Sequence, residues 1–153
     1  MRITVFVWLT LLLIQNTPAD DITIQLLPAL QHPVSNNAVT LVSTDKGNYL
    51  YSFLGLGSGK TWQDISSAAF VLEPGAKTWI ELEPVPGTAG RLAASAVSVG
   101  RAAWLFGGYT VAADGTEQST AGVYRIRPGE SALQWVTDMP VPERQVSGTA
   151  AAI

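Results

Sequence analysis

The 153-residue sequence contains no cysteine and only one histidine, His32. A chain without cysteine forms no disulfide, no Cys-ligated zinc site and no thiol nucleophile. Charged residues make up 14% of the chain, which is low for a charge-rich disordered protein. Nine basic and twelve acidic residues give a net charge of −3, which is not the basic footprint of a nucleic-acid-binding protein. We therefore predict no metal, no other cofactor and no nucleic-acid partner.

The long apolar run of the sequence stands at its start. Arg2 is followed by residues 3–14, which are apolar except for two threonines, and then by short polar or small residues up to Ala19. A basic start, an apolar run and a small residue before the cut are typical of a secretory signal peptide. Twelve residues are too few for the roughly 20 of a membrane span. We predict a signal peptide over 1–19, a mature chain in the periplasm or secreted, and no stable membrane insertion after cleavage.

The rest of the chain, residues 20–153, repeats itself. Two units align over about 33–88 and 91–142, and a third begins at about 144. Trp79 and Trp135 are 56 residues apart, as are Pro84 and Pro140, and Ala38 aligns with Ala96 at a spacing of 58. Each unit consists of short segments rich in Val, Phe, Tyr and Trp, separated by turn residues and without a helical period. Four strands repeated at this spacing indicate blades of a β-propeller.

The second unit carries the more specific pattern. A strand ends in Leu105-Phe106-Gly107-Gly108, a strand with Tyr124 follows, and Trp135 precedes a Met-Pro turn and Arg144. This combination resembles a kelch repeat. The first unit departs from it, with Leu54-Gly55 in place of the glycine pair and Pro33 in place of Arg91. The resemblance implies an all-β, kelch-type β-propeller, incomplete in this chain, with about two four-stranded blades and the start of a third.

The loop at residues 55–62, followed by Trp79 and later by the glycine pair, is similar to the first-blade segment of bacterial sialic acid mutarotases, also called N-acetylneuraminate epimerases. These are periplasmic kelch propellers. The resemblance implies acid/base chemistry on a sugar ring in a full-length parent. The family's catalytic glutamate and arginine belong to later blades, so no catalytic residue is assigned and the isolated chain is expected to be inactive. The alternative is a non-catalytic kelch module that binds a glycan or a protein. Galactose oxidase shares the propeller, but its copper centre needs ligands that this chain lacks.

Other motifs are weaker. Residues 57–61 read Gly-Ser-Gly-Lys-Thr, but a phosphate-binding loop needs a glycine where Leu54 stands and a helix afterwards. His32 has serines and aspartates nearby in sequence but no Gly-x-Ser-x-Gly nucleophile motif. Glu81 and Glu83 lie two apart on one strand, which favours a solvated face over an acid/base pair. We reject nucleotide binding at the first motif, and we interpret His32 as a surface loop residue and the two glutamates as part of a solvated strand face.

In kelch proteins, the loop before the innermost strand and the loop after the glycine pair border one end of the channel. Arginine and tyrosine in these loops suit a carboxylated sugar or an acidic peptide. The alternative is structural, with Arg91 bonding main-chain carbonyls between blades and Ser35 and Asn36 forming a turn. The resemblance places the following channel-mouth candidates in these loops: Ser35, Asn36, Asn37, Arg91, Tyr109, Arg144 and Ser147.

The length of the chain is short for a propeller. The 134 residues after the predicted signal, divided by the 56-residue spacing, give about 2.4 blades, whereas propellers close with roughly 4–8. We therefore expect a fragment or truncated product, whose closure requires missing blades or another chain.

Overall fold

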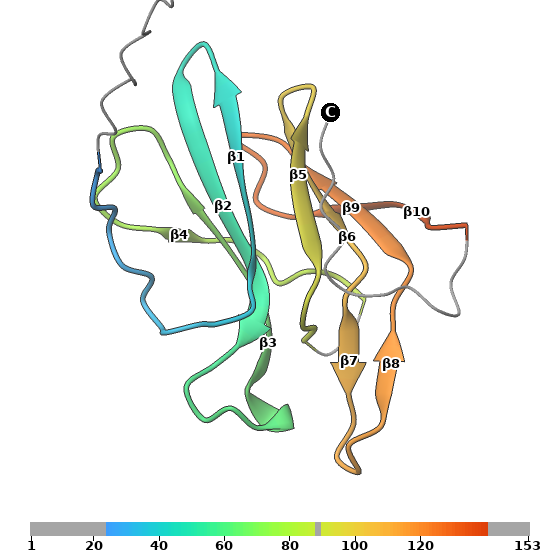
Figure 1. The fold of residues 1–153 in the computed structure, drawn as a ribbon. Helices are drawn as coiled ribbons and strands as arrows, with labels where there is room; N and C mark the ends of the chain where they lie inside the picture. Colours follow the sequence, from blue (N-terminus) through green and yellow to red (C-terminus); the bar gives the residue numbers. More distant parts are fainter. Residues whose placement is uncertain (1–23, 88–89, 141–153) are drawn as a thin grey trace, which may run out of the picture.

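The computed structural model describes residues 24–87 and 90–140. Two four-stranded antiparallel sheets stand side by side (Figure 1), and we call them blade 1 and blade 2. Blade 1 contains β1 (Ala38–Thr44), β2 (Gly47–Leu56), β3 (Ile65–Leu72) and β4 (Ile80–Glu81), in that spatial order. In blade 2 the order is β5 (Ser95–Val99), β6 (Ala102–Phe106), β9 (Gly122–Ile126) and β10 (Gln134–Asp138).

Two smaller elements complete the fold. A hairpin of β7 (Tyr109–Val111) and β8 (Glu117–Ser119) connects β6 to β9, and a 3₁₀ turn η1 (Trp62–Asp64) precedes β3. The predicted all-β architecture with four-stranded blades is confirmed. The predicted signal peptide and the start of the third unit lie outside the described residues. No helix in the part of the chain that the structure describes is long and apolar enough to span a membrane.

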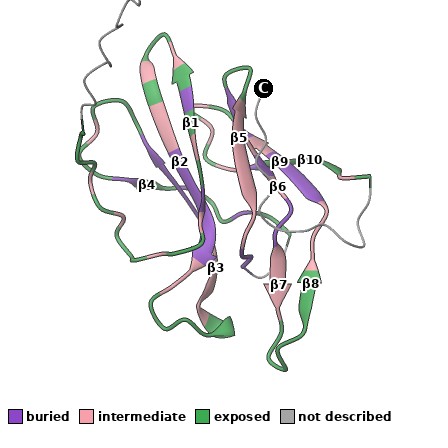
Figure 2. Ribbon diagram, viewed as in Figure 1, coloured by how far each residue is buried: buried purple, intermediate pink, exposed green. Residues whose placement is uncertain are grey.

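In the inner strands of each blade, alternating side chains give one face towards the other blade. On β1, Ala38 and Val42 are buried while Val39 and Leu41 are exposed. The buried side chains of both blades form a single hydrophobic cluster, in which Tyr51 and Phe53 of β2 lie with Leu105 of β6. Burial of this kind contributes roughly 1.5–3 kcal/mol for each large apolar side chain. The facing sheets in Figure 2 are accordingly coloured as buried along their central strands, so the two blades share one core.

The described parts of the connector between the blades, residues 82–87 and 90–92, are held by main-chain hydrogen bonds. Towards β3, the amides of Leu82, Val85 and Arg91 donate to the carbonyls of Ala69, Ser67 and Ser66 at 2.8, 2.8 and 3.4 Å. Towards blade 2, the amide of Glu83 donates to the carbonyl of Ser131 at 2.8 Å. The described parts of the connector thus bond to both blades through their main chains.

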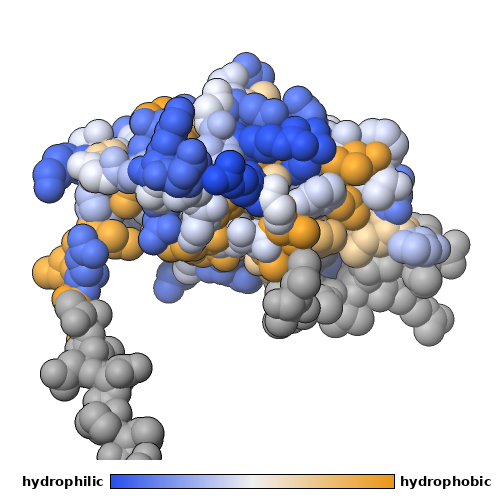
Figure 3. All heavy atoms as spheres, turned by 90° about the horizontal axis from the view of Figure 1, so that it is seen from above, coloured by the Kyte–Doolittle hydropathy of each residue, from blue (hydrophilic) through white to orange (hydrophobic). Residues whose placement is uncertain are grey.

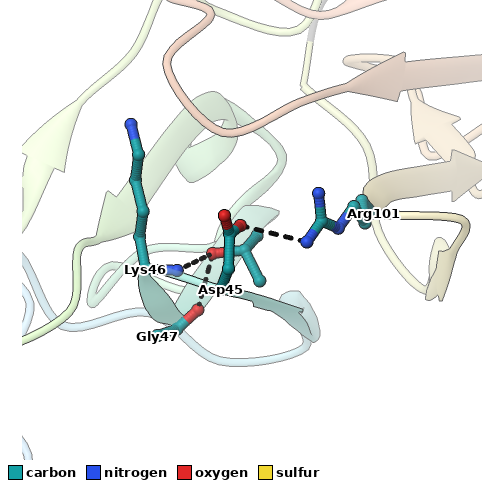
Figure 4. A network of polar contacts seen from close by, with 5 residues as sticks. Asp45, Lys46, Gly47 and Arg101 are labelled. Carbon is teal, nitrogen blue, oxygen red and sulfur yellow. Dashed lines mark hydrogen bonds and ion pairs between the residues drawn. The ribbon is translucent and has the colours of Figure 1, made fainter.

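An ion pair also joins the two blades, at the tips of their first hairpins (Figure 4). Arg101 Nη2 lies 3.0 Å from Asp45 Oδ1, and the side chains are 66% and 75% exposed. Thr44 Oγ1 holds the turn beside it by donating to the Gly47 carbonyl at 3.0 Å and accepting from the Lys46 amide at 3.1 Å. Because solvent-exposed pairs contribute little, this contact adds less to blade packing than the shared core.

The backbone repeats between the blades, including its unusual conformations. Leu54 and Gly55 have φ of 62° and 112°, and Gly107 and Gly108 have 56° and 87°. Leu54 therefore takes the left-handed conformation that glycine takes in blade 2, as the sequence alignment of these pairs implies. Equivalent residues of β2 and β6 are therefore 53 residues apart along the chain. Phe53 pairs with Ala69 and Phe106 with Val123, so equivalent residues of β3 and β9 are 54 apart.

Strand pairing corrects two details of the sequence alignment. Ala38 pairs with Phe53 and Ser95 pairs with Phe106, so Ala38 corresponds to Ser95 and not to Ala96. The run of small residues at 93–96 left the register open by one position, and such a shift reverses every side chain.

The two tryptophans are not equivalent either. Ile80 pairs with Val71 and Gln134 with Arg125, so the residue matching Trp79 is Leu133. Trp79 and Leu133 are buried, whereas Trp135 is 59% exposed. A bulge between Trp135 and Thr137 lengthens β10, which explains why the 56-residue spacing does not hold at the start of the strand.

Candidate functional site

The described channel-mouth candidates lie together where β2 and β6 end. Ser35 pairs with Leu56 and Leu92 pairs with Tyr109, each through an isolated bridge. Between these two bridges, the Gly55 amide donates to the Arg91 carbonyl at 3.2 Å. The loops of both blades therefore meet at one end of the molecule. Arg144 and Ser147 lie outside the described residues.

In blade 1, the candidates form a turn before β1. Ser35 and Asn36 are exposed, and Asn36 has a φ of 56°, a conformation that asparagine tolerates better than most residues. Asn37 is half-buried, and its Nδ2 donates to Ser52 Oγ at 2.8 Å. This hydrogen bond orients the amide, because the Ser52 side chain is itself buried. The turn expected in the structural alternative is present, and it leaves Ser35 and Asn36 open to solvent.

Arg91 is 1% exposed, unlike the other described candidates. Its Nη1 donates to the Gly107 carbonyl at 3.2 Å and to Thr120 Oγ1 at 3.3 Å, and its guanidinium lies 4.8 Å from the centre of the Tyr124 ring. Burial lowers the pKa of Arg91, and the interactions with Tyr124 oppose this effect. The expected bond to a main-chain carbonyl is present, but the acceptor belongs to the same unit and not to the neighbouring blade.

Thr120 is part of this arrangement although nothing in its sequence context indicated it. Its hydroxyl lies 2.9 Å from the Gly107 carbonyl and 3.2 Å from the Gly108 carbonyl. Arg91 and Thr120 thus both donate to the Gly107 carbonyl, and Thr120 also donates to the Gly108 carbonyl. Arg91 Nε and Nη2 have no hydrogen-bond partner among the described residues. Tyr109 is half-buried and follows directly on the glycine pair.

The Gly-Ser-Gly-Lys-Thr loop uses its polar groups internally. The Gly57 amide donates to the Asp64 carbonyl at 3.0 Å, and the Lys60 amide donates to the Gly57 carbonyl at 3.2 Å. The Thr61 amide and hydroxyl both donate to Asp64 Oδ2, at 3.0 and 2.5 Å, and these bonds lower the pKa of the Asp64 carboxyl. The loop leads into η1 and a strand, without the helix that a phosphate-binding loop requires.

The other side chains considered for catalysis, His32, Glu81 and Glu83, do not form a catalytic arrangement. His32, Glu81 and Glu83 are exposed, and Glu83 contributes its main chain to the contact with Ser131. Within residues 24–87 and 90–140, no three His, Asp or Glu side chains are grouped so that they could hold a metal ion.

Comparisons with known proteins agree with the fold. No protein-family model matches the sequence, and no curated protein matches it. The solved structure of YjhT is similar, with a TM-score of 0.53 and 22% sequence identity. The similarity covers 76% of this chain but only 31% of YjhT, so the chain spans about a third of the length of that protein. This likeness supports a kelch-like β-propeller fold for the two blades.

Proposed function

We propose that the chain is part of an exported kelch-type propeller whose channel mouth binds a carboxylated sugar, in a parent protein with sialic acid mutarotase-like activity. The main support for this proposal is the structural similarity of both blades to YjhT, a sialic acid mutarotase with a kelch-type propeller. The meeting of the two mouth loops at one end of the blades adds support. The proposed export rests on the predicted signal peptide.

In this proposal, the exposed mouth residues contact the sugar directly. Ser35 and Asn36 offer hydroxyl and amide groups, and the half-buried Tyr109 offers a ring and a hydroxyl. Arg91 acts as a positioning residue, because its buried guanidinium fixes the Gly107 carbonyl and places a positive charge beneath the mouth. Ring opening requires a proton to leave the anomeric hydroxyl and another to reach the ring oxygen. These transfers are assigned to blades outside this chain.

A non-catalytic binding module is the second candidate. It is favoured by one observation: none of the described mouth candidates is a carboxylate or a histidine, the side chains that most often transfer protons. The same loops would then hold a glycan or protein segment without reaction.

Titration of the 153-residue chain with N-acetylneuraminate, followed by protein NMR, tests the proposal. We expect chemical-shift changes at Ser35, Asn36 and Tyr109. Binding should be weaker in Tyr109→Ala and unchanged in the control Thr110→Ala, which alters the next residue of β7. The rate of anomer exchange is measured in the same samples. The isolated chain should not accelerate it, whereas a full-length parent should.

Two results would count against this account. A parent that binds the sugar without accelerating exchange supports the binding module instead. Absence of any shift with N-acetylneuraminate, together with shifts at the same residues with a neutral sugar, removes the carboxylated ligand.

A further inference from the structure

A pocket of about 200 Å³ lies between the two blades, away from the mouth loops. Blade 1 lines it with residues at the start of β2 and the end of β3, and blade 2 with the turn that connects β9 to β10. The mouth loops follow the other end of β2. We call this site the interblade pocket; its polar lining includes Tyr49, Tyr51, Glu73, Glu130 and Ser131.

The walls of the interblade pocket belong to two blades that are neighbours in the chain. The Glu83 amide of the connector donates to the Ser131 carbonyl at 2.8 Å and so joins the two walls. Figure 3 views the molecule from the end of the hairpin tips, where hydrophilic residues gather near the middle of the surface. Further blades of a longer protein would pack against the outer faces of blades 1 and 2 and not between them. The pocket is therefore formed whether or not such blades follow.

Tyr51 is the buried polar group of this pocket. Its side chain is 1% exposed, and its ring stacks on that of Phe53 with 5.7 Å between the ring centres. Burial is the main cause of its raised pKa, Tyr49, Glu130 and Glu73 add to it, and no hydrogen bond contributes within the described part of the chain. The Tyr51 hydroxyl thus lies near two carboxylates of the pocket without a hydrogen bond to either.

The two carboxylates reach the pocket from different blades. Glu73 is exposed and forms no ion pair within residues 24–87 and 90–140. Glu130 accepts from the Arg127 amide at 2.8 Å, and Arg127 Nη1 lies 3.9 Å from its other oxygen. Because Arg127 is 52% exposed, this long ion pair compensates the Glu130 charge only weakly. Glu81 also lines the pocket, but it pairs with Phe70, so its side chain belongs to the opposite face of the sheet.

We propose that the interblade pocket binds the guanidinium group of an arginine. A guanidinium carries five donors in a planar fork, which can bond Glu73 and Glu130 at the same time and donate to the Tyr51 hydroxyl oxygen. The half-buried Tyr49 offers a ring on which the plane can stack. The pocket is smaller than the roughly 300–1,000 Å³ of sites for drug-sized ligands, so it suits a cation the size of one side chain. This site is separate from the proposed sugar site at the mouth.

Protein NMR of the 153-residue chain, titrated with N-acetyl-argininamide, tests the proposal. This probe carries the guanidinium group without charged termini. We expect saturable chemical-shift changes at Tyr51, Gly129 and Glu130, and none at Ser35 of the mouth. N-acetyl-citrullinamide has nearly the same shape without the charge and should cause no changes. N-acetyl-lysinamide, whose compact ammonium cannot bridge both carboxylates in one plane, should bind more weakly.

Variants identify the groups that hold the probe. Glu73→Gln and Glu130→Gln should each weaken binding about tenfold, because each removes one charge-assisted hydrogen bond. Tyr51→Phe keeps the ring and should weaken binding by about threefold. The matched control is Glu117→Gln, which makes the same change of charge at an exposed position of β8 and should bind as the native chain does. Glu73 is exposed at a turn, so its variant keeps the test valid if Glu130→Gln does not fold.

Three results would overturn the proposal: shifts that do not saturate, equal binding of the citrulline or lysine probe, or a loss in Glu117→Gln as large as that in Glu73→Gln. Two further ligands identify the source of the guanidinium. Tighter binding of a blocked Ala-Arg-Ala peptide than of free L-arginine assigns the pocket to an arginine of a partner protein. Tighter binding of free L-arginine assigns it to a small molecule.

Discussion

Arg91 illustrates at the residue scale how a single side chain holds the candidate site in shape. Replacing it with alanine removes the donor to the Gly107 carbonyl and to Thr120, and leaves a cavity beside Tyr124. We expect Arg91→Ala to lower the free energy of unfolding by about 2–4 kcal/mol. Urea unfolding followed by tryptophan fluorescence measures it. Arg101→Ala, which removes an exposed ion pair with Asp45, should cost less than about 0.5 kcal/mol. Equal losses in the two variants would contradict a structural role for Arg91.

Gly90 is required because the connector passes very close to β3. A Cβ at this position would lie 2.2 Å from the carbonyl oxygen of Ile65, and backbone atoms of Ser66 are nearly as close. We expect Gly90→Ala to destabilise the fold by about 3 kcal/mol or more, because backbone and not a flexible side chain must move. The matched control is Gly115→Ala, where φ is +83° but nothing lies within 4 Å, and where backbone strain alone costs about 1 kcal/mol. Similar unfolding midpoints for both variants would show that the connector can shift.

At the scale of elements, the loop that ends in η1 should depend on pH. The hydrogen bonds from Thr61 hold the pKa of Asp64 below its usual value of 3.8. A carboxyl whose pKa is lowered by folding contributes stability above its unfolded-state pKa and loses it as the pH falls through the folded-state value. We therefore expect the loop to stay formed down to pH about 4 and to loosen in stronger acid. The Thr61 amide, followed by NMR, should report a midpoint below 3.8, and Asp64→Asn should abolish the transition. A midpoint at or above the usual value would be incompatible with these hydrogen bonds.

Elements also show how far the sequence could be interpreted. The strands and turns were predictable because apolar segments and turn residues alternate along the chain, and Leu54-Gly55 could be aligned with Gly107-Gly108. The equivalence of Ala38 and Ser95 in the two blades could not be predicted, because a run of small residues does not distinguish the two faces of the strand. Trp135 was aligned with Trp79 by residue type, but the bulge in β10 gives that position to Leu133.

The meeting of the two candidate loops agrees with the kelch resemblance, whereas their side-chain contacts could not be predicted. That these loops form a ligand site stays a prediction. The burial of Arg91 could not be predicted, since it depends on Thr120 and Tyr124, which lie 29 and 33 residues further along the chain and reach Arg91 only through the fold. A pattern of neighbouring residues carries no signal for such a contact.

For the molecule as a whole, Tyr51 reports whether the two blades remain packed together. Burial, followed by the nearby Tyr49, Glu130 and Glu73, raises the pKa of Tyr51 to about 12 from 10.0. This tyrosine ionises near pH 10 in the unfolded chain but only near pH 12 in the folded chain. The free energy of unfolding is therefore unaffected below pH 10 and falls as the pH rises towards 12.

Urea midpoints between pH 8 and 11.5 test this expectation. The native chain should lose stability more steeply above pH 10 than Tyr51→Phe, which keeps the ring and removes the ionisable hydroxyl. Parallel curves for the two proteins would mean that the Tyr51 hydroxyl is accessible to water and that the blades separate more easily than the shared core implies.

The hydrogen-bonded connector has a consequence for the order in which the chain is made. Its amides at Leu82, Val85 and Arg91 bond to carbonyls of β3, a strand that leaves the ribosome earlier. Blade 1 can thus be assembled, with the connector laid along it, before any strand of blade 2 has been synthesised. The Arg91 amide can then already be bonded to β3 when β5 leaves the ribosome. The strands of blade 2 would pack against a surface of blade 1 that has already formed. The contacts that hold the finished blades together therefore also permit the fold to form from the N-terminus onwards.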